Sequence, residues 1–139
     1  MNAQVQVLLV EDDASLKRSL EKYLERAGYT FYGCSTAREA LALAERLTPD
    51  IVIAEYHLPD ANGLSLLERL KRMVPEVVAI LLSEYDVDCV SKDLFNVAVR
   101  SFLKKPFDLV EFEVALSSAR WKRKQTSIES VEGERRLSV

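Results

Sequence analysis

The sequence predicts an α/β fold built on an open, doubly wound sheet of parallel strands, and three observations predict it. Apolar runs that are too short for helices recur five times along the chain. They lie at Val5–Val10, Phe31–Cys34, Ile51–Ala54, Val77–Leu82 and Ser101–Leu103. The first, third and fourth runs are apolar almost without alternation, which is typical of parallel strands covered on both faces. Segments with helical spacing separate the runs, and strand–helix repetition with short connections indicates a parallel sheet with right-handed crossovers.

A predicted helix follows each predicted strand and is recognised by apolar residues three or four positions apart. In chain order these residues are Leu16, Leu20, Tyr23 and Leu24; Ala40, Leu41, Ala44 and Leu47; Leu64, Leu67 and Leu70; Val87, Val90 and Leu94; and Leu109, Phe112 and Leu116. Gly28 closes the first helix, and Ser35 can cap the second. Asp108 and Glu111 have the capping-box spacing at the start of the fifth helix.

Length and composition indicate one globular domain. The chain has 139 residues, of which 48% are hydrophobic and 29% are charged, which is enough for one domain with a sizeable core. This composition excludes the disordered, collagen-like and disulfide-rich classes. No apolar run approaches the roughly 18 residues that span a membrane, and the first residues lack the pattern of a signal peptide. We therefore expect a cytoplasmic protein without a membrane partner.

The cysteines and the histidine argue against zinc and nucleophilic chemistry. Cys34 and Cys89 fit neither a metal-ligand spacing nor a CxxC motif, so buried free thiols are expected. A zinc site or a Ser-His-Asp triad would depend on His57, the single histidine, and no GxSxG motif occurs. Both enzyme classes are therefore disfavoured.

Charge divides the chain into an acidic body and a basic tail. The residues through Ala119 include 13 basic and 19 acidic side chains, a balance of −6, and those from Arg120 onward include 6 and 3, a balance of +3. We expect a domain over residues 1–120 and a helix extension with a basic and polar tail or linker over 121–139. About 20 tail residues cannot build a reader of DNA bases, so no direct contact with nucleic acid is expected.

Side chains suited to metal and phosphate binding follow four of the predicted strands. Glu11 and Asp12 follow the first strand, Glu55 the third, Ser83 the fourth and Lys105 the fifth. The carboxyl ends of parallel strands meet at one edge of such a sheet, where these folds place their sites. Carboxylate oxygens suit Mg²⁺, and a hydroxyl and an ammonium suit the oxygens of a phosphoryl group. We expect these side chains to form one site.

Four motifs contain these residues: Val7–Asp13 (VLLVEDD), Asp50–Gly63 (DIVIAEYHLPDANG), Ile80–Ser83 (ILLS) and Phe102–Phe107 (FLKKPF). In this order and spacing they resemble the receiver domains of two-component response regulators, and the resemblance covers residues 5 to about 120. It implies the flavodoxin-like (βα)5 fold with strand order 2-1-3-4-5. It also implies a role in signal transduction rather than as an enzyme.

The resemblance further implies a magnesium site. Glu11 and Asp12 would form its acidic pair, and Glu55 and the backbone carbonyl of His57 would be further ligands. If Lys105 neutralises Glu55, the site loses one ligand. The sequence then predicts weaker Mg²⁺ binding than in a typical receiver.

Three residues correspond to the family's phosphate-responsive switch. Ser83 would be the hydroxyl that moves to meet a phosphoryl oxygen, Lys105 the cation that pairs with it, and Phe102 the aromatic side chain that rotates inward in the active state. The Lys105–Pro106 bond is expected to be cis, which an X-Pro bond permits.

Glu55 departs from the family, which has an aspartate as phosphoacceptor at this position. The additional methylene moves the carboxylate by about 1 to 1.5 Å, and a misplacement of about 1 Å can slow phosphoryl transfer about 100-fold. The sequence favours a pseudo-receiver, a protein-interaction module that acts without phosphorylation, in which Glu55 pairs with Lys105 and imitates aspartyl phosphate. Two alternatives remain. One is an inert scaffold, and the other is a receiver that still responds to a phosphodonor and Mg²⁺ in a phosphorelay regulating a separate output domain.

Family members signal through the face of their fourth helix, fifth strand and fifth helix. Here that face would include Asp88, Lys92, Arg100 and Phe112, a set that allows a homodimer. The expected partner is a protein, namely a histidine kinase, an output domain or another signalling protein. A flavodoxin-like cofactor binder is disfavoured, because the acidic segment Glu11–Asp13 after the first strand repels phosphate.

Overall fold

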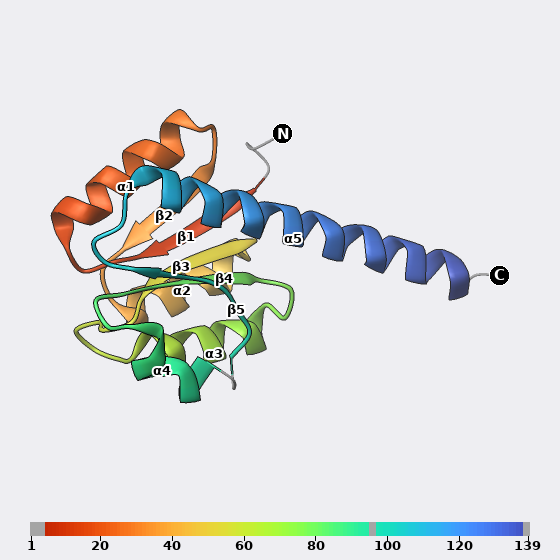
Figure 1. Cartoon of the computed structure of the whole chain (residues 1–139). Coiled ribbons are helices and arrows are strands. Elements are labelled where there is room, and N and C mark those ends of the chain that lie inside the picture. The colour runs from red at the N-terminus through yellow and green to blue at the C-terminus, as the bar shows by residue number, and fades with distance from the viewer. Residues whose placement is uncertain (1–4, 95–96, 138–139) are drawn as a thin grey trace.

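The computed structural model describes residues 5–94 and 97–137, which contain a five-stranded parallel sheet in the order β2-β1-β3-β4-β5 (Figure 1). The strands are β1 (Gln6–Val10), β2 (Thr30–Cys34), β3 (Ile51–Glu55), β4 (Val78–Ser83) and β5 (Val99–Lys104). The predicted order 2-1-3-4-5 is confirmed. The fifth strand is longer than its apolar run predicts, because β5 pairs with β4 from Val99 to Lys104.

Helices alternate with the strands, as the apolar spacing predicts. They are α1 (Ala14–Arg26), α2 (Ala37–Leu47), α3 (Gly63–Met73), α4 (Val87–Leu94) and α5 (Leu109–Leu137). Figure 1 shows α1 and α5 on one face of the sheet and α2, α3 and α4 on the other. The sheet is therefore covered on both faces, which is the doubly wound arrangement.

Two apolar layers fill the space between the sheet and the helices. In β1, Leu8 and Val10 belong to the layer with α2, α3 and α4, whereas Val7 and Leu9 belong to the layer with α1 and α5. All four side chains are at most 1% exposed. Because successive side chains of a strand point to opposite faces, a strand between two helical layers is apolar at every position.

Capping residues define the starts of the helices. Thr36, not Ser35, caps α2: its hydroxyl accepts a hydrogen bond from the backbone N–H of Glu39 at 3.1 Å. The helix therefore begins one residue later than the Ser35 prediction implies. The capping prediction for α5 is confirmed, because Asp108 accepts a hydrogen bond from the N–H of Glu111 at 2.8 Å.

Helix α5 continues through most of the predicted tail and projects from the body of the domain (Figure 1). The polar segment from Gln125, expected as a tail or linker, is helical as far as Leu137. Arg123 fixes the helix to the domain, with Nε 3.2 Å from Asp50 Oδ1 and Nη1 3.5 Å from Glu76 Oε2. The side chains of residues 126–139 lie outside the described residues. Within the described ranges, no helix is both long and apolar enough to cross a membrane.

Phe112 does not lie on the predicted dimer face. Its side chain is fully buried, and its ring packs edge-on against Tyr23 with the centroids 5.5 Å apart. Phe112, Leu116 and Ala119 form the stripe of α5 that packs on the sheet, so the helical periodicity places this ring inward. Lys92 is also predicted on that face, and its side chain lies outside the described residues.

The two free thiols differ in exposure. Cys34 is buried at the end of β2, as predicted, whereas Cys89 is exposed near the start of α4, contrary to the prediction. The next residue, Val90, is buried in the core. Cys89 consequently lies on the outer side of this helix.

Candidate functional site

The carboxyl ends of four strands bring together the side chains that the sequence predicts to form a site. Glu11 follows β1, Glu55 ends β3, Ser83 ends β4 and Lys105 follows β5. Glu11 and Ser83 are fully buried and Glu55 is 5% exposed. The backbone N–H of Lys105 donates to the carbonyl of Ser83 at 2.7 Å, which aligns the ends of β4 and β5. The Lys105–Pro106 bond that follows is cis, as predicted.

Lys105 lies between two buried carboxylates. Its Nζ is 2.5 Å from Oε1 of Glu11 and 3.1 Å from Oε2 of Glu55. The pairing of Glu55 with Lys105 thus occurs, but the ammonium is shared and its shorter contact is with Glu11. The second oxygen of Glu11 accepts a hydrogen bond from the N–H of Asp13 at 3.2 Å.

Burial and this ion-pair cluster act in opposite directions on the protonation of the site. Burial raises the pKa of Glu11 to about 7 against the opposing hydrogen bond and charge of Lys105. Burial likewise raises the pKa of Glu55, and Lys105 again opposes it. Burial lowers the pKa of Lys105, but Glu11 and then Glu55 outweigh burial, so the pKa of the ammonium is raised. Two carboxylates share one ammonium, so the cluster favours a further positive charge, either a proton or a cation.

The donor chemistry of the cluster fits Mg²⁺, but the arrangement does not assemble a complete ligand set. Among the described residues, Lys105 is the only partner of the buried oxygens Glu11 Oε1 and Glu55 Oε2. Such oxygens suit a hard cation. Asp12, however, is exposed, and in the described part of the chain no three His, Cys, Asp or Glu side chains surround one metal position. The ammonium of Lys105 supplies the positive charge that balances Glu11 and Glu55.

Ser83 is held by the backbone of the β4–α4 loop. Its hydroxyl accepts a hydrogen bond from the N–H of Tyr85 at 2.9 Å. Phe102, in contrast, lies within β5, where it is half-buried against the apolar layer of α2, α3 and α4. Ser83 therefore lies at the strand ends beside the ion-pair cluster, whereas Phe102 lies outside that cluster.

The loop after β3 begins under tight steric constraint. The N–H of Gly63, the first residue of α3, donates to the carbonyl of Tyr56 at 2.6 Å. A Cβ at Gly63 would overlap the carbonyl oxygen of Glu55. This close approach fixes the backbone on which the Glu55 carboxylate is mounted. His57, whose carbonyl is a predicted metal ligand, leaves its ring exposed, and its backbone N–H acts to lower the pKa of Glu55 against the larger effect of burial.

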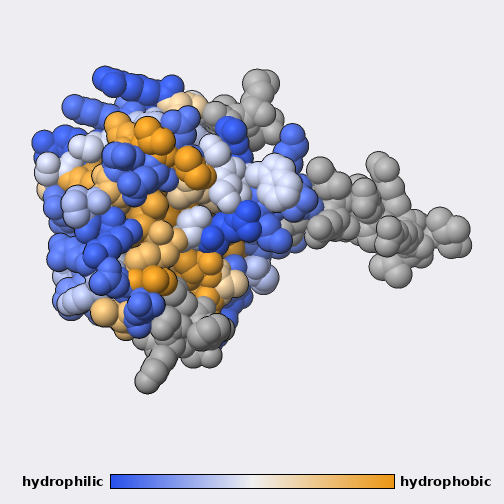
Figure 2. Space-filling view, viewed as in Figure 1, coloured by the Kyte–Doolittle hydropathy of each residue, from blue (hydrophilic) through white to orange (hydrophobic). Residues whose placement is uncertain are grey.

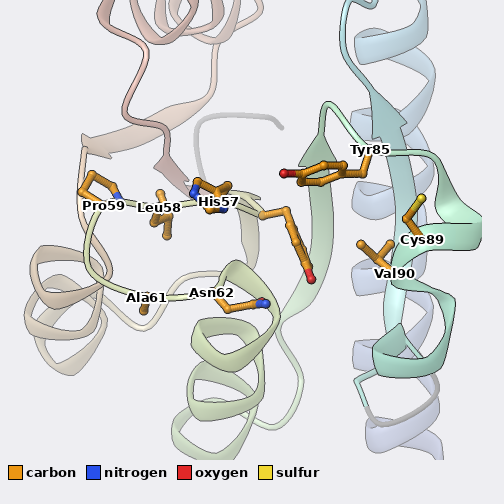
Figure 3. A pocket seen from close by; sticks show the side chains of 9 residues that line it. His57, Leu58, Pro59, Ala61, Asn62, Tyr85, Cys89 and Val90 are labelled. Atoms are coloured by element: carbon orange, nitrogen blue, oxygen red, sulfur yellow. The ribbon is translucent and has the colours of Figure 1, made fainter.

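Two features of the site region were not predicted from the sequence. Asp60 in the β3–α3 loop accepts hydrogen bonds from the N–H groups of Ala37 at 2.8 Å and Arg38 at 3.0 Å, and so caps α2 from another element. Beside the site lies a hollow of about 690 Å³, which we call the tyrosine pocket because Tyr56 and Tyr85 line it (Figure 3). The positions of the tyrosines one residue after Glu55 and two after Ser83 are the sequence signal that could have revealed it.

A family model for the response regulator receiver domain matches residues 7–117. The chain is 32% identical over 111 residues to the sensor kinase CckA of Brucella abortus (strain 2308), covering 78% of this chain and 12% of that protein. It is 30% identical over 117 residues to the transcriptional regulatory protein CrdR of Helicobacter pylori, covering 81% of this chain and 54% of that protein. The chain thus corresponds to about half of CrdR and to a much smaller part of CckA.

Solved structures give the same match in three dimensions. The non-phosphorylated HemR receiver domain of Leptospira biflexa has a TM-score of 0.77 and 29% identity, with 84% of this chain and 94% of that one covered. The signal receiver domain of an HD domain-containing protein of Pseudomonas fluorescens Pf-5 has a TM-score of 0.84 and 27% identity, with 91% and 94% covered. Both alignments extend over nearly the whole of the solved chain.

Proposed function

The chain belongs to the response regulator receiver domain family, and from this premise we propose that it is a pseudo-receiver that binds a protein partner without being phosphorylated. The observation that supports the proposal is the ion pair of Glu55 with Lys105, at 3.1 Å. A glutamate at the phosphoacceptor position already presents its carboxylate to the cation that would otherwise pair with a phosphoryl group. Glu55 then imitates aspartyl phosphate.

The imitation is partial, because a carboxylate has about one negative charge and two oxygens, whereas a phosphoryl group has up to two charges and three oxygens. Lys105 also divides its contacts between Glu55 and Glu11. The hydroxyl of Ser83 accepts a hydrogen bond from the N–H of Tyr85. The proposed state therefore engages the cation of the switch through Glu55 and leaves the hydroxyl with the β4–α4 loop.

Weakened Mg²⁺ binding belongs to the same proposal. Receiver domains generally bind Mg²⁺ at their acidic site. In this chain Glu11, Asp12, Glu55 and the carbonyl of His57 are the proposed ligands, and an ion entering among them competes with the Lys105 ammonium for the same two carboxylates. The ion would supply positive charge, and the residues would supply oxygen donors.

Receiver domains interact with histidine kinases and output domains in two-component signalling. We assign this chain a protein partner of that kind and a cytoplasmic location, and we propose that copies associate through the face formed by α4, β5 and α5. Figure 2 shows hydrophobic side chains reaching the surface between hydrophilic ones in the view of Figure 1. On α5, Leu109, Val110 and Val114 are 53%, 66% and 64% exposed. These residues replace Phe112 in the proposed interface.

The test compares Glu55→Asp and Glu55→Gln with the parent. Incubation with acetyl phosphate and Mg²⁺, followed by intact-mass measurement, is expected to leave the parent unmodified and to add one phosphoryl group to Glu55→Asp. Binding of beryllofluoride is a second, non-covalent test of whether each protein can hold a phosphoryl group at this position. A stoichiometric adduct on the parent that disappears in Glu55→Gln would support the alternative, a receiver that still responds to a phosphodonor.

Mimicry has its own readout, which is the amide NMR spectrum around the site. The parent is expected to resemble the phosphorylated Glu55→Asp protein at Lys105, and Glu55→Gln is expected to resemble unphosphorylated Glu55→Asp. If the parent and Glu55→Gln have the same spectrum at Lys105, Glu55 does not act as a mimic and the inert scaffold is favoured.

A further inference from the structure

A hollow lies at the opposite end of the sheet from the Glu11–Glu55–Lys105 cluster, where β4 and β5 begin. We call it the basic hollow, because Lys71 of α3, Arg100 of β5 and Lys122 of α5 line it. Its volume is about 340 Å³, which is near the lower end of the range of ligand sites in proteins. The hollow therefore has room for a small molecule.

Two of the basic side chains have N–H groups to spare for a ligand. Nζ of Lys71 donates to the carbonyl of Val77 at 2.9 Å, and an ammonium has further N–H groups beyond the one used there. Nε of Arg100 donates to the hydroxyl of Ser118 at 3.0 Å, and its Nη1 and Nη2 groups remain able to donate. The hollow thus offers hydrogen-bond donors that are also positively charged.

The charge balance of the lining favours an anion. Among the described residues that line the hollow, Glu76 is the only acidic one, and its Oε2 is 3.5 Å from Nη1 of Arg123, which is outside the lining. Burial lowers the pKa of Lys71, and the positive charge of Lys122 lowers it further. The two ammonium groups are therefore close enough to repel each other, and an anion between them would offset that repulsion.

The remainder of the lining is apolar. It consists of Pro75, Val77, Val78, Ala98 and Val99, of which the first two valines are buried. An inorganic anion has no apolar surface to place against these side chains, and a neutral apolar molecule would leave the cations without a partner of opposite charge. An aliphatic chain that ends in an oxyanion matches both parts of the lining.

We propose that the basic hollow binds a small organic acid, in which a carboxylate is attached to a short aliphatic chain. The planar guanidinium of Arg100 matches the geometry of a carboxylate, and the ammonium groups of Lys71 and Lys122 add positive charge beside it. The aliphatic chain would lie against the valines. This ligand site goes beyond the proposed function and does not depend on whether Glu55 imitates a phosphoryl group.

A series of ligands tests the two parts of the assignment. Hexanoate is titrated into the isotope-labelled full chain at constant ionic strength, and binding is followed by the amide NMR shifts of Ala98, Arg100 and Lys122. These shifts are expected to saturate. Hexanamide, which lacks the charge, and acetate and inorganic phosphate, which lack the chain, should each bind at least about 10-fold more weakly.

Other results of this titration would overturn the proposal. They are an absence of saturation with hexanoate, and affinities for hexanamide, acetate or phosphate equal to that for hexanoate. The peptide acetyl-Gly-Glu-Gly-amide carries a carboxylate on a peptide backbone and serves as a further comparison. If it binds more tightly than hexanoate, the hollow recognises an acidic peptide and the assignment to a small acid is wrong.

Matched variants test the basic side chains. Arg100→Gln and Lys122→Gln are each expected to weaken hexanoate binding by about 5-fold or more, because each removes a cation from the lining. Lys104→Gln on the same strand and Lys124→Gln on the same helix remove exposed cations outside the lining, so they should stay within about 2-fold of the parent. Unchanged affinity in either lining variant, or equal losses in the control variants, would overturn the proposal.

A second measurement uses the unsubstituted protein, so it does not depend on the folding of any variant. Nuclear Overhauser effects are expected between the methylene protons of hexanoate and the methyl groups of Val78 and Val99. If the amide shifts saturate without these effects, the acid binds elsewhere and the proposal is wrong. The Glu55→Gln protein should bind hexanoate as the parent does, so failure of mimicry and failure of this proposal give different results.

Discussion

Lys105 makes its shortest ion pair with Glu11, at 2.5 Å between Nζ and Oε1, rather than with the glutamate at the phosphoacceptor position. The Lys105 side chain is 14% exposed and that of Glu11 is fully buried. Both groups are removed from water, so each depends on the other for compensation of its charge. Lys105, which follows β5, therefore has a structural role in addition to any role in signalling.

Replacement of Lys105 is expected to destabilise the domain strongly. Lys105→Met keeps the length of the side chain but leaves Glu11 and Glu55 buried without a cation. Removal of one partner from a buried ion pair typically costs about 3–5 kcal/mol. We expect a loss of this size in the free energy of unfolding, measured with urea at pH 7 in the presence of EDTA.

The neighbouring lysine provides the matched control. Lys104 pairs with Asp86 at 2.6 Å, but both side chains are more than half exposed. Exposed pairs contribute about 1 kcal/mol or less, so Lys104→Met should change stability by no more than that. Similar losses in the two variants would mean that the buried cluster does not hold the strand ends together.

Removal of the ammonium should also strengthen metal binding. In Lys105→Met, a Mg²⁺ ion no longer competes with a lysine for the oxygens of Glu11 and Glu55. We expect Mg²⁺ to bind this variant more tightly than the parent and to recover part of its lost stability, because a ligand of the folded state stabilises it by mass action. Thermal unfolding in a Mg²⁺ titration measures both effects. Equal affinities in the two proteins would show that Lys105 does not weaken the metal site.

The sequence could predict which side chains gather at the sheet edge but not how they pair. Parallel strands end at a common edge, so the residues after the apolar runs of β1 and β3 must lie near each other. Glu11 and Glu55 follow from that rule. The choice of Lys105 between them depends on distances of a few ångströms across the sheet, which no spacing along the chain encodes.

Other differences have equally local causes. Ser35 and Thr36 are adjacent hydroxyl residues, and only the start of the backbone helix decides which one caps α2. The family resemblance predicts Phe112 on the surface, although its own apolar spacing fits the buried stripe of α5. Asp60 caps a helix that begins 23 residues earlier, a contact formed only when the loops meet in the folded domain.

Gly63→Ala should be destabilising because of a backbone overlap. A Cβ at this position would meet the carbonyl oxygen of Glu55 and the Cα of Tyr56, neither of which can move independently of β3. Overpacking of this kind costs about 1–3 kcal/mol. Gly33→Ala is the control, because there the Cβ meets the carboxylate end of the Glu21 side chain, which can rotate away. Urea unfolding should show a clear loss for Gly63→Ala and little change for Gly33→Ala, and equal losses would contradict the overlap argument.

Asp60 gives a prediction for the dependence of stability on pH. Hydrogen bonds from the N–H groups of Ala37 and then Arg38 hold the pKa of the Asp60 carboxyl below its usual value of 3.8. A carboxyl with a lowered pKa in the folded state contributes stability above its unfolded pKa and loses it as the pH falls through the folded value. Asp60→Asn keeps only one acceptor oxygen, so it should be less stable than the parent at pH 7. The difference should persist down to about pH 5 and narrow at lower pH, where the parent also loses the charge. Urea unfolding of both proteins across this range measures the difference, and a constant gap down to the acid transition would show that the charge of Asp60 does not support the start of α2.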